Sequence, residues 1–170
     1  MTTWIKNQQG EKFTFPKAFV IKATPNFETG VDQQKLPISG PMNNQGIDID
    51  GNAKTITISG QFMDTSQSVI TVNDVVPETC DLRSMKLMKY WFEAILSGLQ
   101  IPIEFSSYLD EFSALGSGNT EMFDPVSNKN VILRANYIKT RVYVIGFQCD
   151  DDEGDVERIP FTLTLWVAGI

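Results

Sequence analysis

Carboxylates are the residues of this chain whose types and spacing come closest to a reactive or metal-binding site. The densest group is a run near the carboxyl end that consists of Asp150, Asp151, Asp152, Glu153, Asp155 and Glu157. Oxygen-rich loops can hold Ca²⁺, but here a glycine stands at the fifth place and no glutamate at the twelfth, unlike an EF-hand loop. The run favours a solvated hairpin turn. A metal site and a patch that docks on a basic partner stay open as alternatives.

Two further carboxylate pairs have the residue types of a glycoside hydrolase: Asp110 with Glu111, and Glu121 with Asp124. Both pairs lie in polar stretches, where carboxylates are usually solvated. The chain contains no histidine, which excludes Ser-His-Asp and Cys-His catalysis and removes the commonest general base and metal ligand. We therefore expect no catalytic, cofactor-binding or metal-binding residue, and a protein that is not an enzyme.

The two cysteines, Cys80 and Cys149, have no neighbours in sequence that would lower a thiol pKa. Two cysteines are also far fewer than a secreted disulfide scaffold carries. We expect a reduced, buried pair.

Length, composition and charge bound the class of protein. The chain has 170 residues, of which 42% are hydrophobic, and this predicts one domain over residues 1–170. Fourteen basic and twenty-one acidic residues give a net charge of −7, the wrong sign for gripping phosphate, although an acidic surface can let nucleic acid slide past. No apolar run reaches the length of a signal peptide or of a membrane span, so we expect no membrane insertion and synthesis in the cytoplasm.

Period-two patterns of β-branched and aromatic residues dominate the chain and predict strands. Lys54–Met63 is the clearest, with Ile56 and Ile58 on one face and Thr55 and Thr57 on the other, and Gly60 indicating a bulge or bend. The other predicted strands are Phe13–Phe15, Ala18–Ala23, Ser68–Val72, Ile101–Phe105, Val131–Tyr137, Thr140–Phe147 and Phe161–Val167.

One segment, residues 81–98, has apolar residues at helical spacing. Thr79 or Asp81 can cap its beginning and Gly98 can end it. Its predicted core residues are Met88, Trp91, Phe92 and Ile95. The fold class is thus mainly β: an antiparallel β-barrel or two packed sheets, with one flanking α-helix along a sheet edge or across an open end.

Two long polar stretches interrupt this pattern. In residues 25–52, glycine and proline are spaced too closely for a long regular element, and Asp50-Gly51 predicts a tight turn into the next strand. Residues 106–130 predict a second long loop. Loops of this length in a compact domain are usually functional or are ordered by a partner.

This order of elements resembles the tail-tube and baseplate proteins of tailed bacteriophages, and through them the tube protein of type VI secretion. The segments that carry the resemblance are K-T-I-T-I-S-G-Q-F at Lys54–Phe62 and F-T-L-T-L-W-V-A-G at Phe161–Gly169. The resemblance implies a small antiparallel barrel or two packed sheets flanked by one helix, repeated as a six-fold ring around a lumen, with no active site.

The resemblance also implies a function. The chain would be a structural subunit of a contractile tail in the virion, in the tube or at the tube-baseplate junction, and DNA would pass the lumen without specific binding. Its partners would be further copies of itself and other tube, baseplate or tail-terminal proteins, and ring closure would give open sheet edges a partner. Candidate subunit-interface residues are Phe27, Val31, Leu36, Ile38 and Met42 in the arm, and Asp150, Asp151, Asp152 and Glu153 in the acidic run.

Two functions of other classes stay open. A β-sandwich binding module of a phage fibre would use Trp4, Tyr108 and Trp166 as exposed stacking platforms. A hydrolase that uses one of the carboxylate pairs is the least favoured.

Overall fold

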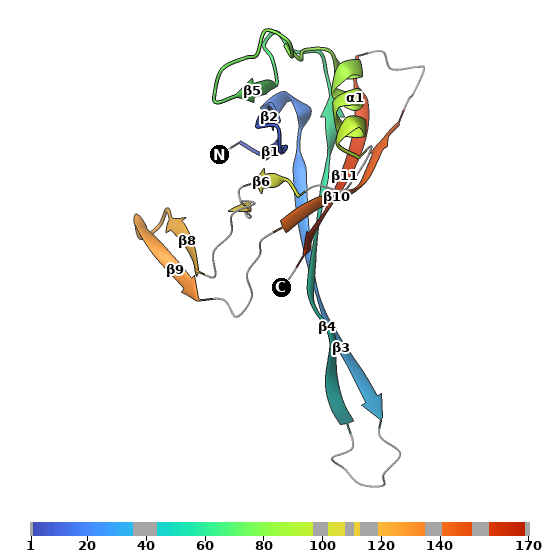
Figure 1. Cartoon of the computed structure of the whole chain (residues 1–170), viewed down its shortest axis with the longest axis vertical. Helices are drawn as coiled ribbons and strands as arrows, with labels where there is room; N and C mark the ends of the chain where they lie inside the picture. The colour runs from blue at the N-terminus through green and yellow to red at the C-terminus, as the bar shows by residue number, and fades with distance from the viewer. Residues whose placement is uncertain are drawn as a thin grey trace.

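The computed structural model describes residues 2–35, 44–96, 102–107, 111–112, 119–134, 141–150 and 157–168. Their strands form two antiparallel sheets and a separate hairpin (Figure 1). In the order β5-β2-β1-β6-β7, the five-stranded sheet contains β5 (Ile70–Val72), β2 (Glu11–Thr14), β1 (Trp4–Lys6), β6 (Glu104–Ser106) and β7 (Glu111–Phe112). In the order β10-β11-β4-β3, the four-stranded sheet contains β10 (Arg141–Cys149), β11 (Ile159–Ala168), β4 (Asn44–Phe62) and β3 (Lys22–Lys35). The hairpin consists of β8 (Asn119–Asp124) and β9 (Lys129–Arg134).

The two sheets enclose one hydrophobic core. A bridge between Ile103 and Val142 links them, with the Ile103 N–H donating to the Val142 carbonyl at 2.8 Å. The mainly β prediction is confirmed in its form of two packed sheets with one helix, because the described strands do not close into a barrel. The predicted alternation also holds, since Ile56, Ile58 and Leu163 are fully buried while their neighbours along the strands face outward.

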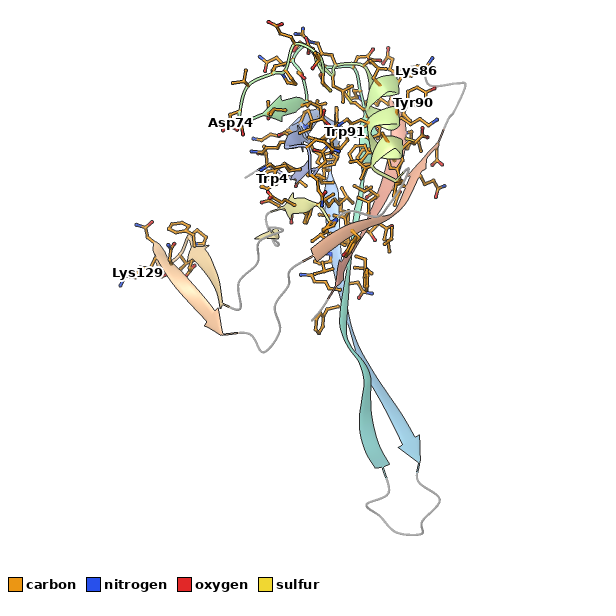
Figure 2. All side chains as sticks on the ribbon, viewed as in Figure 1. Trp4, Asp74, Lys86, Tyr90, Trp91 and Lys129 are labelled. Atoms are coloured by element: carbon orange, nitrogen blue, oxygen red, sulfur yellow. The ribbon has the colours of Figure 1, made fainter. Side chains whose placement is uncertain are left out.

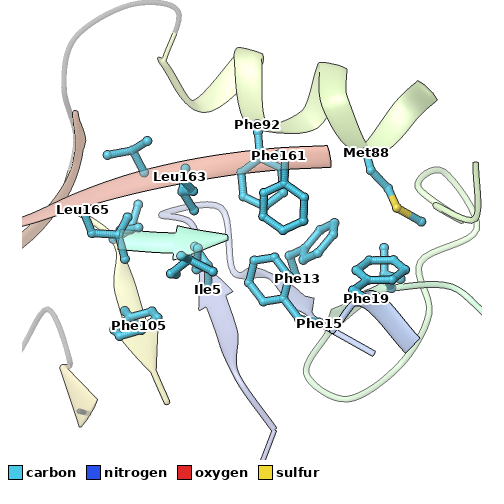
Figure 3. Close-up of a cluster of buried hydrophobic side chains, with 14 of the residues drawn as sticks. Ile5, Phe13, Phe15, Phe19, Met88, Phe92, Phe105, Phe161, Leu163 and Leu165 are labelled. Atoms are coloured by element: carbon cyan, nitrogen blue, oxygen red, sulfur yellow. The ribbon is translucent and has the colours of Figure 1, made fainter. Parts of the chain in front are cut away.

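Helix α1 (Met85–Leu96) covers the core from the side of the four-stranded sheet (Figures 1 and 3). Phe92 is fully buried and lies 4.9 Å from the Phe13 ring of the five-stranded sheet and 5.3 Å from the Phe147 ring of the four-stranded sheet, measured between centroids. Met88 is also fully buried, whereas Trp91 and Ile95 are half-buried against the same cluster. The predicted core face of the helix is therefore confirmed, with Phe92 at its centre.

The beginning of the helix differs from the prediction. It starts at Met85, four residues after Asp81, and its first N–H donates to Asp64 Oδ1 at 2.9 Å. Asp81 instead holds Arg83 through two contacts of 2.9 Å, while the Leu82 N–H donates to Ser68 Oγ at 3.0 Å. The chain before the helix is therefore fixed to residues 65–69, and the capping carboxylate comes from a distant position in sequence.

A half-buried carboxylate ties the helix to the five-stranded sheet. Glu11 Oε2 accepts hydrogen bonds from Asn7 Nδ2 at 2.7 Å and from Trp91 Nε1 at 3.1 Å. This arrangement satisfies the indole N–H, as a partly buried tryptophan requires.

Gly60 is explained by close approach and not by the predicted bulge. Its pairing with Phe161 is regular. A Cβ at this position would lie 2.5 Å from Ile21 Cδ1 and 2.9 Å from the Phe19 carbonyl oxygen. The turn that follows η1 (Lys17–Phe19) thus packs directly on the backbone of β4.

The prediction that residues 25–52 lack a long regular element is wrong for the part that the structure describes. β3 and β4 pair from Lys22 with Ser59 to Lys35 with Asn44, forming a long ribbon that extends well beyond the core (Figure 1). The register shifts between the Thr29–Asn52 and Val31–Asp48 pairs, so Asp50-Gly51 lies in an irregularity of β4 and not in a tight turn. Ladder hydrogen bonds, which local composition does not reveal, order this segment.

The prediction of a loop over residues 106–130 is also wrong in part. It contains β7, all of β8 and the turn to β9, and the β8–β9 hairpin stands apart from both sheets (Figure 1). Asp124 builds this turn by accepting the N–H groups of Val126 at 3.0 Å and Ser127 at 3.3 Å, while Asn128 adopts a positive φ of 54°.

Candidate subunit interface

The predicted interface residues fall into three groups. Phe27 is 47% exposed at the point where the β3–β4 ribbon leaves the core, and Val31 lies further out on β3, opposite Asp48. Asp150 is exposed directly after β10, where its N–H donates to the Pro160 carbonyl at 3.0 Å and its Oδ1 accepts Gln148 Nε2 at 3.3 Å. Leu36, Ile38, Met42, Asp151, Asp152 and Glu153 lie outside the described residues.

The β3–β4 ribbon is the first candidate surface. Beyond Phe27 and Lys54 its two strands pair with each other while they run away from both sheets (Figures 1 and 2). A two-stranded ribbon in water is marginally stable at best, because neither face packs on a core. The ribbon is therefore the part of the molecule that gains most from contact with a partner.

The outer side of the four-stranded sheet is the second candidate, and we call it the hydroxyl face. Its residues alternate with the buried residues of the same four strands. They are Lys22, Thr24, Asn26, Thr55, Thr57, Ser59, Tyr143, Gly146, Gln148, Thr162, Thr164 and Trp166. Lys22 is the one charged residue of this set, and further charged side chains border it: Asp150 Oδ1 accepts Gln148 Nε2 at 3.3 Å, and Arg158 Nη1 donates to Gln61 Oε1 at 3.4 Å.

Aromatic side chains stand at one end of the hydroxyl face. Trp166 is 39% exposed, and its ring lies 5.9 Å from that of Tyr143 on the adjacent strand, with the planes inclined by 31°. Ile145, at the irregularity of β10, is also exposed beside them. A Cβ at Gly146 would make ordinary van der Waals contact with the Thr164 Cβ, at 3.8 Å. The sequence pattern predicted the outward threonines of β4 but not that four strands would join them into one face.

The β8–β9 hairpin is the third candidate surface. Phe123 and Val126 at its turn are 60% and 93% exposed, and Val131 is exposed as well. The pKa of the Asp124 carboxyl is lowered, chiefly by the hydrogen bond from the Ser127 side chain and then by that from the Val126 N–H. Exposed apolar residues on an isolated hairpin are a typical signature of a surface that another molecule covers.

Of the two carboxylate pairs proposed for a hydrolase, three of the four residues lie in the part of the chain that the structure describes. Asp124 serves the hairpin turn, Glu111 and Glu121 lie in β7 and β8, and Asp110 lies outside the described residues. Within the described part of the chain, no group of three or more acidic or cysteine residues is placed to hold a metal ion. The acidic run at 151–156 lies outside that part.

Neither cysteine forms a disulfide, and both are half-buried, so the prediction of a buried pair is wrong with respect to burial. Burial raises the pKa of the Cys80 thiol, and the carboxylates of Glu11 and Asp81 raise it further. Cys80 is therefore held as a protonated thiol at neutral pH, which makes it a poor nucleophile.

The stacking platforms proposed for a binding module differ in exposure. Trp4 is half-buried, with the Lys12 ammonium 5.0 Å from its ring centroid, whereas Trp166 is exposed and Tyr108 lies outside the described residues. Among the described residues, no helix has the length and apolar character needed to cross a membrane.

No protein-family model matches the chain, and no curated protein matches it.

Proposed function

We propose that the chain is a non-enzymatic structural subunit that assembles with further copies of itself into a ring, as part of a bacteriophage tail tube or tube-baseplate junction. The observation that carries the proposal is the β3–β4 ribbon, which runs beyond the core while its strands pair with each other (Figure 1). Because an isolated two-stranded ribbon is only marginally stable, packing on a neighbouring subunit would stabilise it. The hydroxyl face and the β8–β9 hairpin provide further surface for such contacts.

The net charge of −7 fits a ring whose lumen DNA passes, because an acidic surface repels the phosphates and does not retain them. Further tube, baseplate or tail-terminal proteins would be the partners above and below the ring. The likeness to tail-tube and baseplate proteins in the order of elements supports this placement.

The mass and shape of the purified protein test the proposal. Sedimentation velocity should give an oligomer, and negative-stain images should show closed rings. A protein that stays monomeric across the accessible concentrations, and that also fails to join rings when its tail or baseplate partners are present, would contradict it.

Shortening the ribbon tests the part that carries the proposal. Asn-Gly in place of residues 29–52 would join Glu28 to Ala53, which are paired in the register, through a two-residue turn. The core residues stay in place, so the variant should fold with an unchanged thermal midpoint but should no longer assemble. A control variant with Asn-Gly in place of Asn73-Asp74, the two-residue turn after β5, should fold and assemble like the parent.

The exposed Trp166 favours a second candidate function, a β-sandwich binding module that stacks a ligand on this ring. Titration of the protein with soluble glycans, followed by tryptophan fluorescence, separates this function from the first. A saturable change that disappears in Trp166→Phe would favour the binding module.

A further inference from the structure

Two strand edges stay open in the part of the chain that the structure describes. β11 follows β4 only as far as the Val167–Lys54 pair, so residues 44–53 of β4 pair with β3 alone among the described strands. In the separate hairpin, β9 pairs with β8 and with no other described strand. An open edge offers backbone N–H and C=O groups to a further strand. The ribbon and the hairpin each have two strands, fewer than an independently stable sheet needs.

The charges along these two edges are opposite. Residues 44–53 contain two aspartates, Asp48 and Asp50, and no basic residue. β9 contains Lys129 and Arg134 and no acidic residue. Opposite charges on paired strands stabilise a sheet, and like charges that face each other destabilise it. The edge of β4 is therefore matched to β9 and not to a second β4, and β9 is not matched to a second β9.

We infer that β9 of one copy adds to β4 of a second copy, at residues 44–53, so that the hairpin and the ribbon join into one sheet. Figure 1 shows the β8–β9 hairpin and the outer part of the β3–β4 ribbon apart from each other in one chain, so a second copy has to supply the strand. Every copy then gives β9 to one neighbour and receives β9 from another, which is a head-to-tail contact of the kind that closes a ring. The inference rests on the proposed assembly and names the contact through which it occurs.

Other strands fit the edge of β4 less well. β8, the opposite edge of the hairpin, contains two acidic residues and no basic one, so it would place like charges beside the aspartates. Residues 28–35 of β3, the opposite edge of the ribbon, contain two acidic residues and one basic residue and therefore match β9 less closely than β4 does. A strand from a different protein would cover the edge of β4 only. A second copy covers the edges of β4 and β9 with a single kind of contact.

Charge reversal on the two strands tests the inference in the full-length protein. Asp48→Lys with Asp50→Lys makes the edge of β4 basic, and Lys129→Glu with Arg134→Glu makes β9 acidic. Each double variant alone then brings like charges together, and its association, measured by sedimentation velocity, should weaken by about tenfold or more. An equimolar mixture of the two variants restores opposite charges at the contacts between unlike copies, so association should return to that of the parent.

The change in overall charge provides an internal control. Each Asp-to-Lys change adds two charges, so the first double variant has a net charge of −3 in place of −7, which lowers general repulsion between copies. Weaker association of this variant would therefore run against the effect of net charge. Glu78→Lys and Lys86→Glu reverse exposed charges outside the ribbon and the hairpin, and each should assemble like the parent. Thermal unfolding of every variant separates a loss of folding from a loss of association.

Three outcomes overturn the inference. If the parent assembles and both double variants assemble equally well, the two strands do not pair, although the proposed function stands. If only one double variant loses association, or if the mixture of two non-associating variants does not regain it, β4 and β9 do not meet between copies. If the parent does not assemble under any condition, the proposed function and the inference fail together.

Discussion

Replacing Phe92 by alanine removes the side chain around which the two sheets and the helix meet. The ring is fully buried, and its centroid lies between 4.9 and 6.0 Å from those of Phe13, Phe15, Phe62, Trp91 and Phe147. Phe-to-Ala changes in cores cost about 3–5 kcal/mol of unfolding free energy. We expect the upper part of this range, because the five rings come from β2 and the segment after it, from β4, from β10 and from α1, and cannot collapse into the space together.

Urea denaturation followed by fluorescence measures the effect. With a slope of about 2 kcal/mol per molar urea, a loss of about 4 kcal/mol lowers the midpoint by about 2 M. Leu87→Ala is the matched control, since Leu87 is half exposed on the outer side of the same helix, where the labelled Lys86 and Tyr90 also project (Figure 2). We expect that control to change stability by about 0.5 kcal/mol or less. If Phe92→Ala lies within about 1 kcal/mol of Leu87→Ala, α1 does not seal the core, and the packing account is refuted.

Three further substitutions test local features of the structure. Gly60→Ala should destabilise the protein by about 1–3 kcal/mol, because the new Cβ would lie 2.9 Å from the Phe19 carbonyl oxygen. Gly146→Ala should leave the denaturation midpoint nearly unchanged, because its Cβ would lie 3.8 Å from the Thr164 Cβ, an ordinary contact distance. Equal midpoints for the two variants would contradict this prediction. Val20→Gly should raise the thermal midpoint by relieving about 1 kcal/mol of strain, since Val20 is β-branched, 72% exposed and held at a φ of 51°; a lowered midpoint would argue against strain. Ser127→Ala should raise the pKa of Asp124 toward its ordinary value in a carboxyl NMR titration. Because the pKa of Asp124 is lowered in the folded protein, its ionised carboxylate stabilises the hairpin at pH values above the unfolded-state pKa, and this contribution disappears as pH falls through the folded-state pKa. Over that pH range, amide protection in β8–β9 should therefore decline more in the parent than in Ser127→Ala.

Local periodicity was sufficient to predict the helix, its buried face and the clearest strands, because burial imposes that periodicity on the residues themselves. The start of α1 was not predictable in this way, since the capping Asp64 lies 21 residues before Met85 in sequence. The same limit applies to β1, a strand of three residues that exists through its pairing with β2 and β6. It applies most to the β3–β4 ribbon. The sequence of these polar strands predicts a loop, because hydrogen bonds between the two strands, and not a buried face, hold them in place.

The candidate surfaces also differ in how far local sequence predicts them. The outward threonines of β4 follow from a single strand pattern, but the hydroxyl face requires the strand order β10-β11-β4-β3, which brings residues near 22, 57, 145 and 164 together. The isolated hairpin with Phe123 and Val126 at its turn was hidden, because β8 begins directly after a glycine-rich stretch that predicts a loop.

The two edges of the four-stranded sheet oppose simple strand-to-strand addition, and this bears on how copies would associate. Pro25 lies within the edge strand β3 and has no N–H to offer a further strand, a position that proline occupies when its nitrogen faces away from the existing ladder. The opposite edge strand, β10, is irregular between Val144 and Gly146, and such bulges discourage pairing at an edge. Both features disfavour extension of the ladder along the core. Association through the β3–β4 ribbon beyond Pro25, or through the hydroxyl face, needs neither of these edge ladders, and both surfaces include residues of β3 and β4.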